Sequence, residues 1–197
     1  MPAPKISVII PVYNAAAYLE QCIRSVMNQT MQEIEIIAIN DGSTDDSKTI
    51  LDQLAATDER LKVFHNSNRG VSATRNVGLQ HATGEYISFC DADDFMEPTM
   101  LAELYQSMQE HHCDWAICNV RIISSDGSVK TRLKLSEGVV NTAGEKAGEV
   151  EKFMRFIYDN ANWNKLFSAA IIRERQIKFD ESMFLWEDLL FNLVYLQ

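Results

Sequence analysis

Four short apolar segments in the first half of the chain constrain its fold more than any other feature. They comprise residues 6–12, 34–39, 61–64 and 86–90, and the first two are rich in Ile and Val and barely alternate with polar residues. Strands with this pattern are buried on both faces, which is typical of a parallel sheet. The segments therefore predict four strands of one sheet.

Amphipathic segments lie between these strands. In the first of them one helical face carries apolar side chains, namely Tyr18, Leu19, Cys22, Ile23, Val26 and Met27. A second helix is expected to bury Leu51 and Leu54, with Ser43 or Asp45 as its N-cap. A third helix is expected over residues 71–81. Strand and helix thus alternate, which predicts an α/β fold with right-handed crossovers.

The second half of the chain is less regular. A fourth helix is expected with Pro98 near its first turn, followed by a strand over residues 115–120. Residues 121–149 are rich in Ser, Gly, Lys and Glu with weak periodicity, which indicates loops and short antiparallel strands. Apolar residues at helical spacing predict further helices near residues 150–157 and over residues 186–194.

The last helical pattern reaches Gln197 without a Gly or Pro stop signal. We therefore expect the natural protein to continue beyond this residue. The change of pattern divides the chain into residues 1–120 and residues 121–197, as two halves of one domain that is expected to be incomplete at its C-terminus.

The formal charge of −10, with 18 basic and 28 acidic residues, argues against nonspecific binding to nucleic acid. An anionic substrate would need a local cation, either Arg or a metal ion. The sequence contains no apolar run of the roughly 20 residues that a membrane helix needs and no apolar signal-peptide core at its start. Four cysteines without zinc spacing favour a reducing cytoplasm.

Polar residues follow all four predicted strands. Ligands of open α/β sheets bind outside the carboxyl ends of the strands, so these residues are expected to converge. The segments that follow the first to the fourth strand contain Pro11, Val12, Tyr13 and Asn14, then Asp41, then Asn68, Arg69 and Gly70, and finally Asp91, Ala92, Asp93 and Asp94.

Asp91 and Asp93 are the strongest single feature among these residues. Three carboxylates within four residues repel one another at a strand end unless a cation offsets their charge. Mg²⁺ and Mn²⁺ prefer oxygen ligands and often bridge one or two carboxylates to substrate phosphates. The alternative is a solvated turn before the next helix, since Asp is common in turns. The neighbouring strand ends favour a metal site, with Asp93 as the first choice of ligand and Asp91 as the second.

Other candidate residues carry open alternatives. Asp41 could accept a hydrogen bond from a base or a ribose, or form an Asx turn. Arg75 could bind a diphosphate through both arms of its guanidinium, or be a surface charge. Glu187 and Asp188 could supply a general base, or stabilise the start of the last helix. Trp163 and Trp186 could line a sugar site, although packing in the core is the interpretation that we favour for them.

Four segments together resemble the family 2 glycosyltransferases. They read ISVIIPVYNAAAYLEQCIRSVMNQT, INDGSTDDS, NRGVSATRNVGL and GEYISFCDADD, and the later NWNKLF and WEDLLFN resemble the continuation of the bacterial members. The resemblance covers nearly the whole chain in order. It implies a GT-A fold, in which residues 1–120 bind the nucleotide-sugar and residues 121–197 carry the catalytic base.

The resemblance also implies an inverting transfer of a sugar from a nucleotide-diphosphate donor, with UDP as the favoured nucleotide. Pro11, Val12, Tyr13 and Asp41 are then expected at the nucleoside, and Asp91 and Asp93 at the ribose-diphosphate and the Mn²⁺ or Mg²⁺ ion. Asp188, with Glu187 second, is expected to be the base. The acceptor would be a saccharide or a lipid-linked molecule in polysaccharide or glycolipid synthesis.

The expected location is the cytoplasm. Association with the inner face of the membrane is an alternative, and it would require parts of the protein outside this chain. Two rival functions stay open. One is a nucleotide-sugar-binding module without catalysis. The other is an aspartyl-phosphate hydrolase, which is disfavoured because its Asp-x-Asp motif belongs on the first strand and not on the fourth.

Overall fold

The computed structural model describes residues 3–124, 126–131 and 161–197. Its centre is a six-stranded sheet with the order β3-β2-β1-β4-β8-β5, and β6 and β7 form a separate antiparallel hairpin. Strands β1 to β4 pair in parallel, whereas β8 pairs antiparallel with both β4 and β5. The strands are β1 Ile6–Val12, β2 Ile34–Asp41, β3 Leu61–Asn66, β4 Tyr86–Phe89, β5 Trp115–Ile117, β6 Arg121–Ile123, β7 Val129–Thr131 and β8 Lys165–Ser168.

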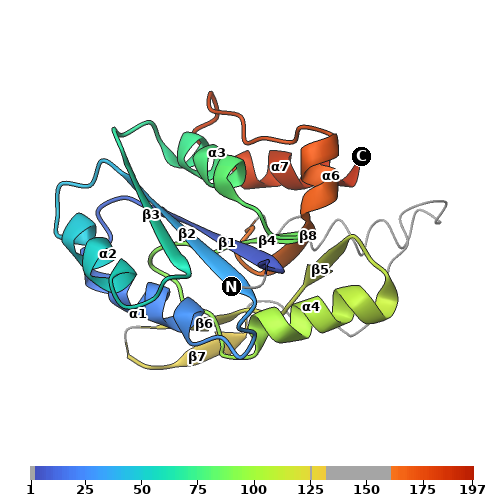
Figure 1. Cartoon of the computed structure of the whole chain (residues 1–197), viewed down its shortest axis with the longest axis horizontal. Coiled ribbons are helices and arrows are strands. Elements are labelled where there is room, and N and C mark those ends of the chain that lie inside the picture. Colours follow the sequence, from blue (N-terminus) through green and yellow to red (C-terminus); the bar gives the residue numbers. More distant parts are fainter. Residues whose placement is uncertain (1–2, 125, 132–160) are drawn as a thin grey trace.

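Helices cover both faces of the sheet (Figure 1). Helices α1, α2 and α4 lie on one face, and α3, α6 and α7 lie on the other. The helices are α1 Ala16–Met27, α2 Ser47–Ala55, α3 Val71–His81, α4 Met100–His111, α6 Ala169–Glu174 and α7 Glu187–Leu196. The predicted helix near residues 150–157 lies outside the described residues.

Alternation along the strands divides the core into two layers. Ile6, Val8 and Ile10 of β1 belong to the cluster that packs under α1, α2 and α4. Ile9 of the same strand belongs to the cluster under α3, α6 and α7. Helix α3 packs very close to the sheet, because a Cβ atom at Gly78 would lie 2.3 Å from Ile9 Cγ2. The two faces explain why β1 and β2 are apolar at successive positions.

The four predicted parallel strands and the extent of the third helix are confirmed. The prediction was wrong in detail elsewhere. The strand predicted over residues 115–120 ends at Ile117. The N-cap residue of α2 is Asp46 and not Ser43 or Asp45, although the Asp45 carboxylate accepts a hydrogen bond from the Ser47 amide. Tyr18, which was assigned to the apolar face of the first helix, has 58% of its surface exposed. Neither β8 nor α6 was predicted.

The position of β8 joins the two halves of the chain. Although β8 lies in the segment 121–197, it is inserted between β4 and β5 of the first half. The division at residue 120 stays a prediction, and the sheet itself is continuous across it.

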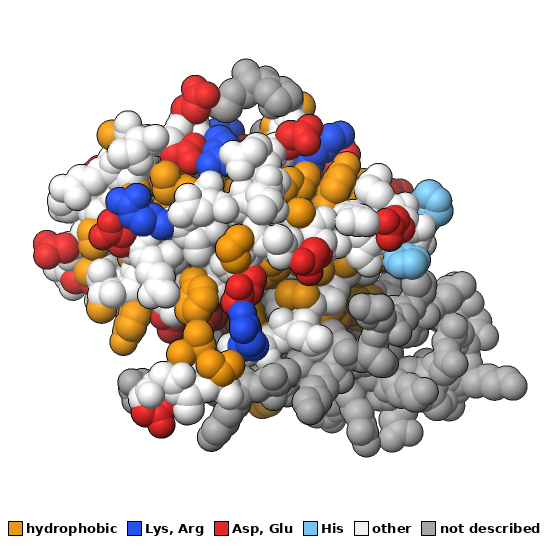
Figure 2. Space-filling model, turned by 90° about the horizontal axis from the view of Figure 1, so that it is seen from below, with side chains coloured by type: hydrophobic (Ala, Val, Ile, Leu, Met, Phe, Trp, Pro, Cys, Tyr) orange, Lys and Arg blue, Asp and Glu red, His pale blue; other side chains and the backbone are white. Residues whose placement is uncertain are grey.

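Within the described residues, no helix combines the length and apolarity needed to cross a membrane. Acidic side chains are spread among a few basic ones over the face shown in Figure 2.

A buried carboxylate fixes the amino-terminal edge of the sheet. Glu35 Oε1 accepts hydrogen bonds from the Ser7 hydroxyl at 2.6 Å and from the backbone and hydroxyl of Thr83 at 2.6 and 2.8 Å. Its Oε2 accepts a bond from Lys62 Nζ at 2.6 Å. Burial alone would raise the pKa of Glu35, but these hydrogen bonds outweigh burial and lower the pKa to about 2.

We predict that this carboxylate makes stability depend on pH. Because its pKa falls from 4.5 in the unfolded chain to about 2 in the fold, its contribution of about 3 kcal/mol is complete above pH 4.5 and is lost as the pH falls toward 2. Denaturant unfolding of the wild type and of Glu35→Gln between pH 7 and pH 2.5 measures this contribution. The variant should lose stability at pH 7 and show a flatter acid limb.

The matched control is Glu33→Gln, at an exposed position two residues earlier. It should leave the unfolding free energy within about 0.5 kcal/mol of the wild type. Equal acid limbs for the wild type and Glu35→Gln would contradict the role of Glu35.

Candidate active site

A pocket of about 500 Å³ lies at the carboxyl ends of the parallel strands. The polar segments after all four strands contribute to it, as their common edge predicted. The residues that line it are Pro11, Val12, Tyr13, Asn14, Ala15, Tyr18, Asp41, Asn68, Gly70, Val71, Thr74, Asp91, Ala92 and Asp93. Of the residues expected to bind nucleotide, only Arg69 and Arg75 are not part of this lining.

Asp41 holds the loop between β3 and α3 at one side of the pocket. Its Oδ1 accepts a hydrogen bond from the Arg69 amide at 2.8 Å, and its Oδ2 accepts one from the Gly70 amide at 2.9 Å. Gly42 next to it has φ +70°, and a Cβ there would lie 2.8 Å from the Asn68 nitrogen. The carboxylate therefore shapes the loop and also faces the pocket, where its remaining lone pairs are available to a ligand.

Two tyrosines give the pocket exposed aromatic surface. Tyr13 follows β1 and Tyr18 lies on α1, and 54% and 58% of their surfaces are exposed. Asn14 between them adopts a positive φ of 49° and accepts a hydrogen bond from the Thr44 amide at 2.8 Å, so its side chain fixes the loop before α1. Planar aromatic faces of this kind can stack on a nucleobase.

Asp91 and Asp93 form the acidic edge of the pocket after β4, and Asp94 follows them in the chain. Burial, together with the charges of Asp91 and Asp93, raises the pKa of Asp94 to about 6. Among the described residues no group of three or more His, Cys, Asp or Glu side chains is arranged to enclose a metal ion. Two carboxylates that line one pocket nevertheless suit Mg²⁺ or Mn²⁺, which take their other ligands from water and phosphate.

The buried guanidinium of Arg75 links this acidic edge to α7. Its Nη2 donates a hydrogen bond to Asp91 Oδ1 at 3.0 Å, and its Nη1 donates to Asp188 Oδ1 at 2.7 Å and to Glu187 Oε1 at 3.1 Å. Only 4% of its side chain is exposed, and the ring of Phe179 lies 5.3 Å away. In this structure Arg75 is thus not a surface charge; it binds three carboxylates and is not among the residues that line the pocket.

Asp188 accepts its hydrogen bonds through one carboxylate oxygen, Oδ1. Both hydrogen bonds that the described residues make to its carboxylate fall on Oδ1, from Arg75 and from Asn162 Nδ2 at 3.0 Å. Burial raises the pKa of Asp188 to about 6, with the charge of Arg75 opposing this rise and those of Glu187 and Asp91 adding to it. A carboxylate with a pKa near 6 is suited to general base catalysis close to neutral pH.

Two residues that support this site, Asn162 and Lys165, were not predicted from the sequence. Lys165 is fully buried and donates a hydrogen bond to Asn164 Oδ1 at 2.8 Å. Polar residues directly before a short apolar stretch, in the segment NWNKLF, were the signal that could have revealed them. The side chain of Arg69 lies apart from the charged cluster formed by Arg75, Asp91, Glu187 and Asp188. It pairs with Glu181 at 2.9 Å, and both side chains are exposed.

Comparison with known proteins identifies the family of this chain. Residues 7–175 match the family described as Glycosyl transferase family 2. The chain belongs to this family. The uncharacterized glycosyltransferase EpsJ of Bacillus subtilis (strain 168) is 34% identical over 192 residues, which cover 96% of this chain and 55% of that protein. The putative glycosyltransferase EpsH of the same strain is 33% identical over 183 residues, 91% of this chain and 51% of EpsH.

Solved structures give the same result for the fold. The crystal structure of S. aureus TarS 1-349 has a TM-score of 0.81 and 27% identity, and the match covers 97% of this chain and 55% of the TarS chain. The match confirms the expected GT-A fold, a mostly parallel sheet flanked by helices. TarS 1-349 has also been solved with UDP and with UDP-GlcNAc. This glycosyltransferase chain spans about half the length of EpsJ and EpsH.

We predict that Arg75→Met destabilises the glycosyltransferase by about 3–5 kcal/mol, because it leaves three partly buried carboxylates without their shared cation. Arg75→Lys should lose less, since it keeps the charge but not the planar fork. Urea denaturation measures both variants.

Arg69→Met is the matched control, because it removes a guanidinium from a pair whose side chains are 60% and 45% exposed. Its effect should stay below about 1 kcal/mol. A loss for Arg75→Met as small as that for Arg69→Met would show that the buried cluster does not stabilise the fold.

Proposed function

We propose that the protein transfers a sugar from a nucleotide-diphosphate donor, with a UDP-sugar as the first choice, to an acceptor hydroxyl with inversion at the anomeric carbon. The observation that carries the proposal is the link through Arg75 between Asp91, at the edge of the large pocket, and Asp188, the candidate base. Membership of the family supports it.

The large pocket is the proposed donor site. Pro11, Val12 and Tyr13 would contact the nucleoside, and Asp41 would accept a hydrogen bond from the base or the ribose in addition to those of the loop amides. The rest of its lining, with Asn14, Asn68, Gly70 and Ala92, would surround the ribose and the diphosphate. The UDP and UDP-GlcNAc complexes of TarS support this choice of ligand.

Asp93 and Asp91 would hold Mn²⁺ or Mg²⁺ together with the diphosphate. The two carboxylates fit this role because they line the same pocket and their charges repel each other and Asp94. When bound, the ion supplies positive charge that stabilises the leaving diphosphate. Arg75 binds Asp91 through Oδ1, and Oδ2 would be the oxygen that binds the ion. We therefore assign Arg75 to positioning the carboxylates, and Arg69 to donating its backbone amide to Asp41.

Asp188 is the proposed general base, and Glu187 stands beside it. Arg75 and Asn162 fix Oδ1, and Oδ2 would accept the proton from the acceptor hydroxyl. The oxygen of that hydroxyl would attack the anomeric carbon from the side opposite the diphosphate. Because Asp188 must be ionised to accept the proton, the rate of transfer should rise with pH through about 6.

The wider role follows from the same chemistry. We place the protein in polysaccharide or glycolipid synthesis, with a saccharide or lipid-linked acceptor, in the cytoplasm where nucleotide-sugars would reach the pocket. One relative, the poly(ribitol-phosphate) beta-glucosyltransferase of Bacillus spizizenii, has a polymer in its name; it is 32% identical over 193 residues, 96% of this chain and 29% of that protein.

Asp188→Asn tests the assignment of the base. In the complete protein the variant should lose about 10²–10⁴-fold in kcat for sugar transfer and lose the rise with pH near 6. Its affinity for UDP in the presence of Mn²⁺, measured by calorimetry, should stay within about threefold of the wild type, because Asp188 lies outside the large pocket. Near-normal transfer by Asp188→Asn would contradict the assignment.

Asp93→Asn is the complementary variant. It should weaken UDP binding in Mn²⁺ by about tenfold or more while leaving the metal-free affinity nearly unchanged. Binding of UDP without any turnover in the complete wild-type protein would instead favour a nucleotide-sugar-binding module.

A further inference from the structure

The residues directly before the candidate base are apolar and exposed. Phe184, Leu185 and Trp186 have 97%, 72% and 59% of their surfaces exposed. Three consecutive large apolar side chains on the surface are unusual, and such patches mark binding sites more often than single exposed residues do. The expectation that Trp186 packs in the core was therefore wrong.

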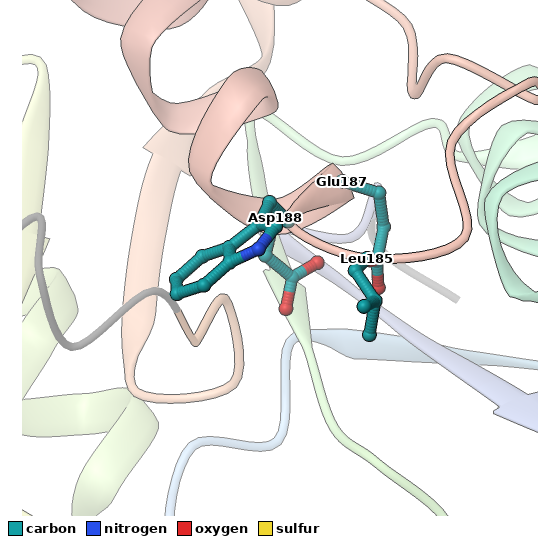
Figure 3. A pocket seen from close by; sticks show the side chains of 4 residues that line it. Leu185, Glu187 and Asp188 are labelled. Atoms are coloured by element: carbon teal, nitrogen blue, oxygen red, sulfur yellow. The ribbon is translucent and has the colours of Figure 1, made fainter.

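Two of these side chains share a pocket with the acidic pair. This second pocket has a volume of about 290 Å³ and is lined by Leu185, Trp186, Glu187 and Asp188. In Figure 3 the labelled side chains of Leu185, Glu187 and Asp188 project to the same side of the chain where it enters α7. The pocket thus combines an apolar surface with the carboxylate that is proposed to accept the proton.

Trp186, at the start of α7, has an unusual backbone conformation. Its φ is +69°, in the left-handed region that bulky residues rarely adopt. Its carbonyl accepts a hydrogen bond from the Leu190 amide at 3.0 Å, so Trp186 caps the first turn of α7. A strained residue persists only where its surroundings hold it, and such residues cluster at ligand-binding positions.

We propose that Leu185 and Trp186 form the acceptor subsite, and that its occupant is a neutral pyranose ring of a saccharide acceptor. This inference rests on the proposed function, because it names the acceptor for the base Asp188. The C–H face of a pyranose would lie against the indole and the leucine side chain. Its hydroxyls would then face Glu187 and Asp188, which are hydrogen-bond acceptors when ionised.

Charge separates this acceptor from a phosphate-bearing one. The Arg75 cluster brings one positive and three negative groups together, and both charged residues in the described lining of the second pocket are acidic. A polyol phosphate would therefore be repelled at this position, whereas a neutral ring would not. The relative from Bacillus spizizenii, whose name contains poly(ribitol-phosphate), represents the contrasting class of acceptor.

The test uses the complete protein with UDP-GlcNAc as donor and measures UDP release. The acceptor probes are the p-nitrophenyl β-pyranosides of glucose, galactose and N-acetylglucosamine, with ribitol phosphate as the contrasting probe. Trp186→Ala should raise the KM for the preferred pyranoside by about tenfold, the loss expected for one stacking contact. The KM for UDP-GlcNAc should change less than twofold, and Trp186→Tyr should recover most of the acceptor affinity.

Phe184→Ala is the matched control, because Phe184 is equally apolar and more exposed but is not among the lining residues. It should leave the KM for the pyranoside unchanged. An unchanged KM in Trp186→Ala, an equal rise in Phe184→Ala, or a preference for ribitol phosphate over every pyranoside would overturn the inference. UDP release from the donor with none of the pyranosides accelerating it would overturn it as well. A wild type that releases no UDP under any condition would count against the proposed function instead.

Discussion

The site depends on one buried guanidinium. Arg75 neutralises carboxylates that come from two distant parts of the chain, Asp91 after β4 and Glu187 with Asp188 at the start of α7. Without a cation between them these acids could not share a partly buried position, because their charges repel in a medium of lower dielectric constant than water. Helix α3, which carries Arg75, lies close to the sheet, and Gly78 permits this approach by its lack of a side chain.

The pairing of Arg75 with these carboxylates joins two parts of the site. On one side the large pocket lies over the ends of the parallel strands and includes Asp91 and Asp93. On the other side the smaller pocket lies beside Asp188 and is partly apolar. The proposed transfer would need such an arrangement, because the donor and the acceptor would have to be held next to each other with the base beside the acceptor hydroxyl. Asn162 completes it by fixing the same oxygen of Asp188 that Arg75 binds.

Local sequence patterns predicted the parts of this fold that local interactions determine. Apolar segments buried on both faces identified β1 to β4, and the polar residues after them predicted the edge at which they converge. The insertion of β8 between β4 and β5 could not be predicted, because a four-residue strand has too little pattern and its partners lie far along the chain. The partners of Arg75 were equally hidden, since they lie 16, 112 and 113 residues away. Trp186 was expected to pack in the core because it is hydrophobic, but the backbone holds its side chain at the surface.

The claim that Arg75 and Asp188 act as one unit is tested most directly by a double-mutant cycle on the unfolding free energy. Arg75→Met, Asp188→Asn and the double variant would be compared with the wild type by urea denaturation at pH 8. If the guanidinium neutralises Asp188, the double variant should be about 1–3 kcal/mol more stable than the sum of the two single losses predicts, because Asp188 no longer adds an unpaired charge beside Asp91 and Glu187. Losses that add without any coupling would contradict the account.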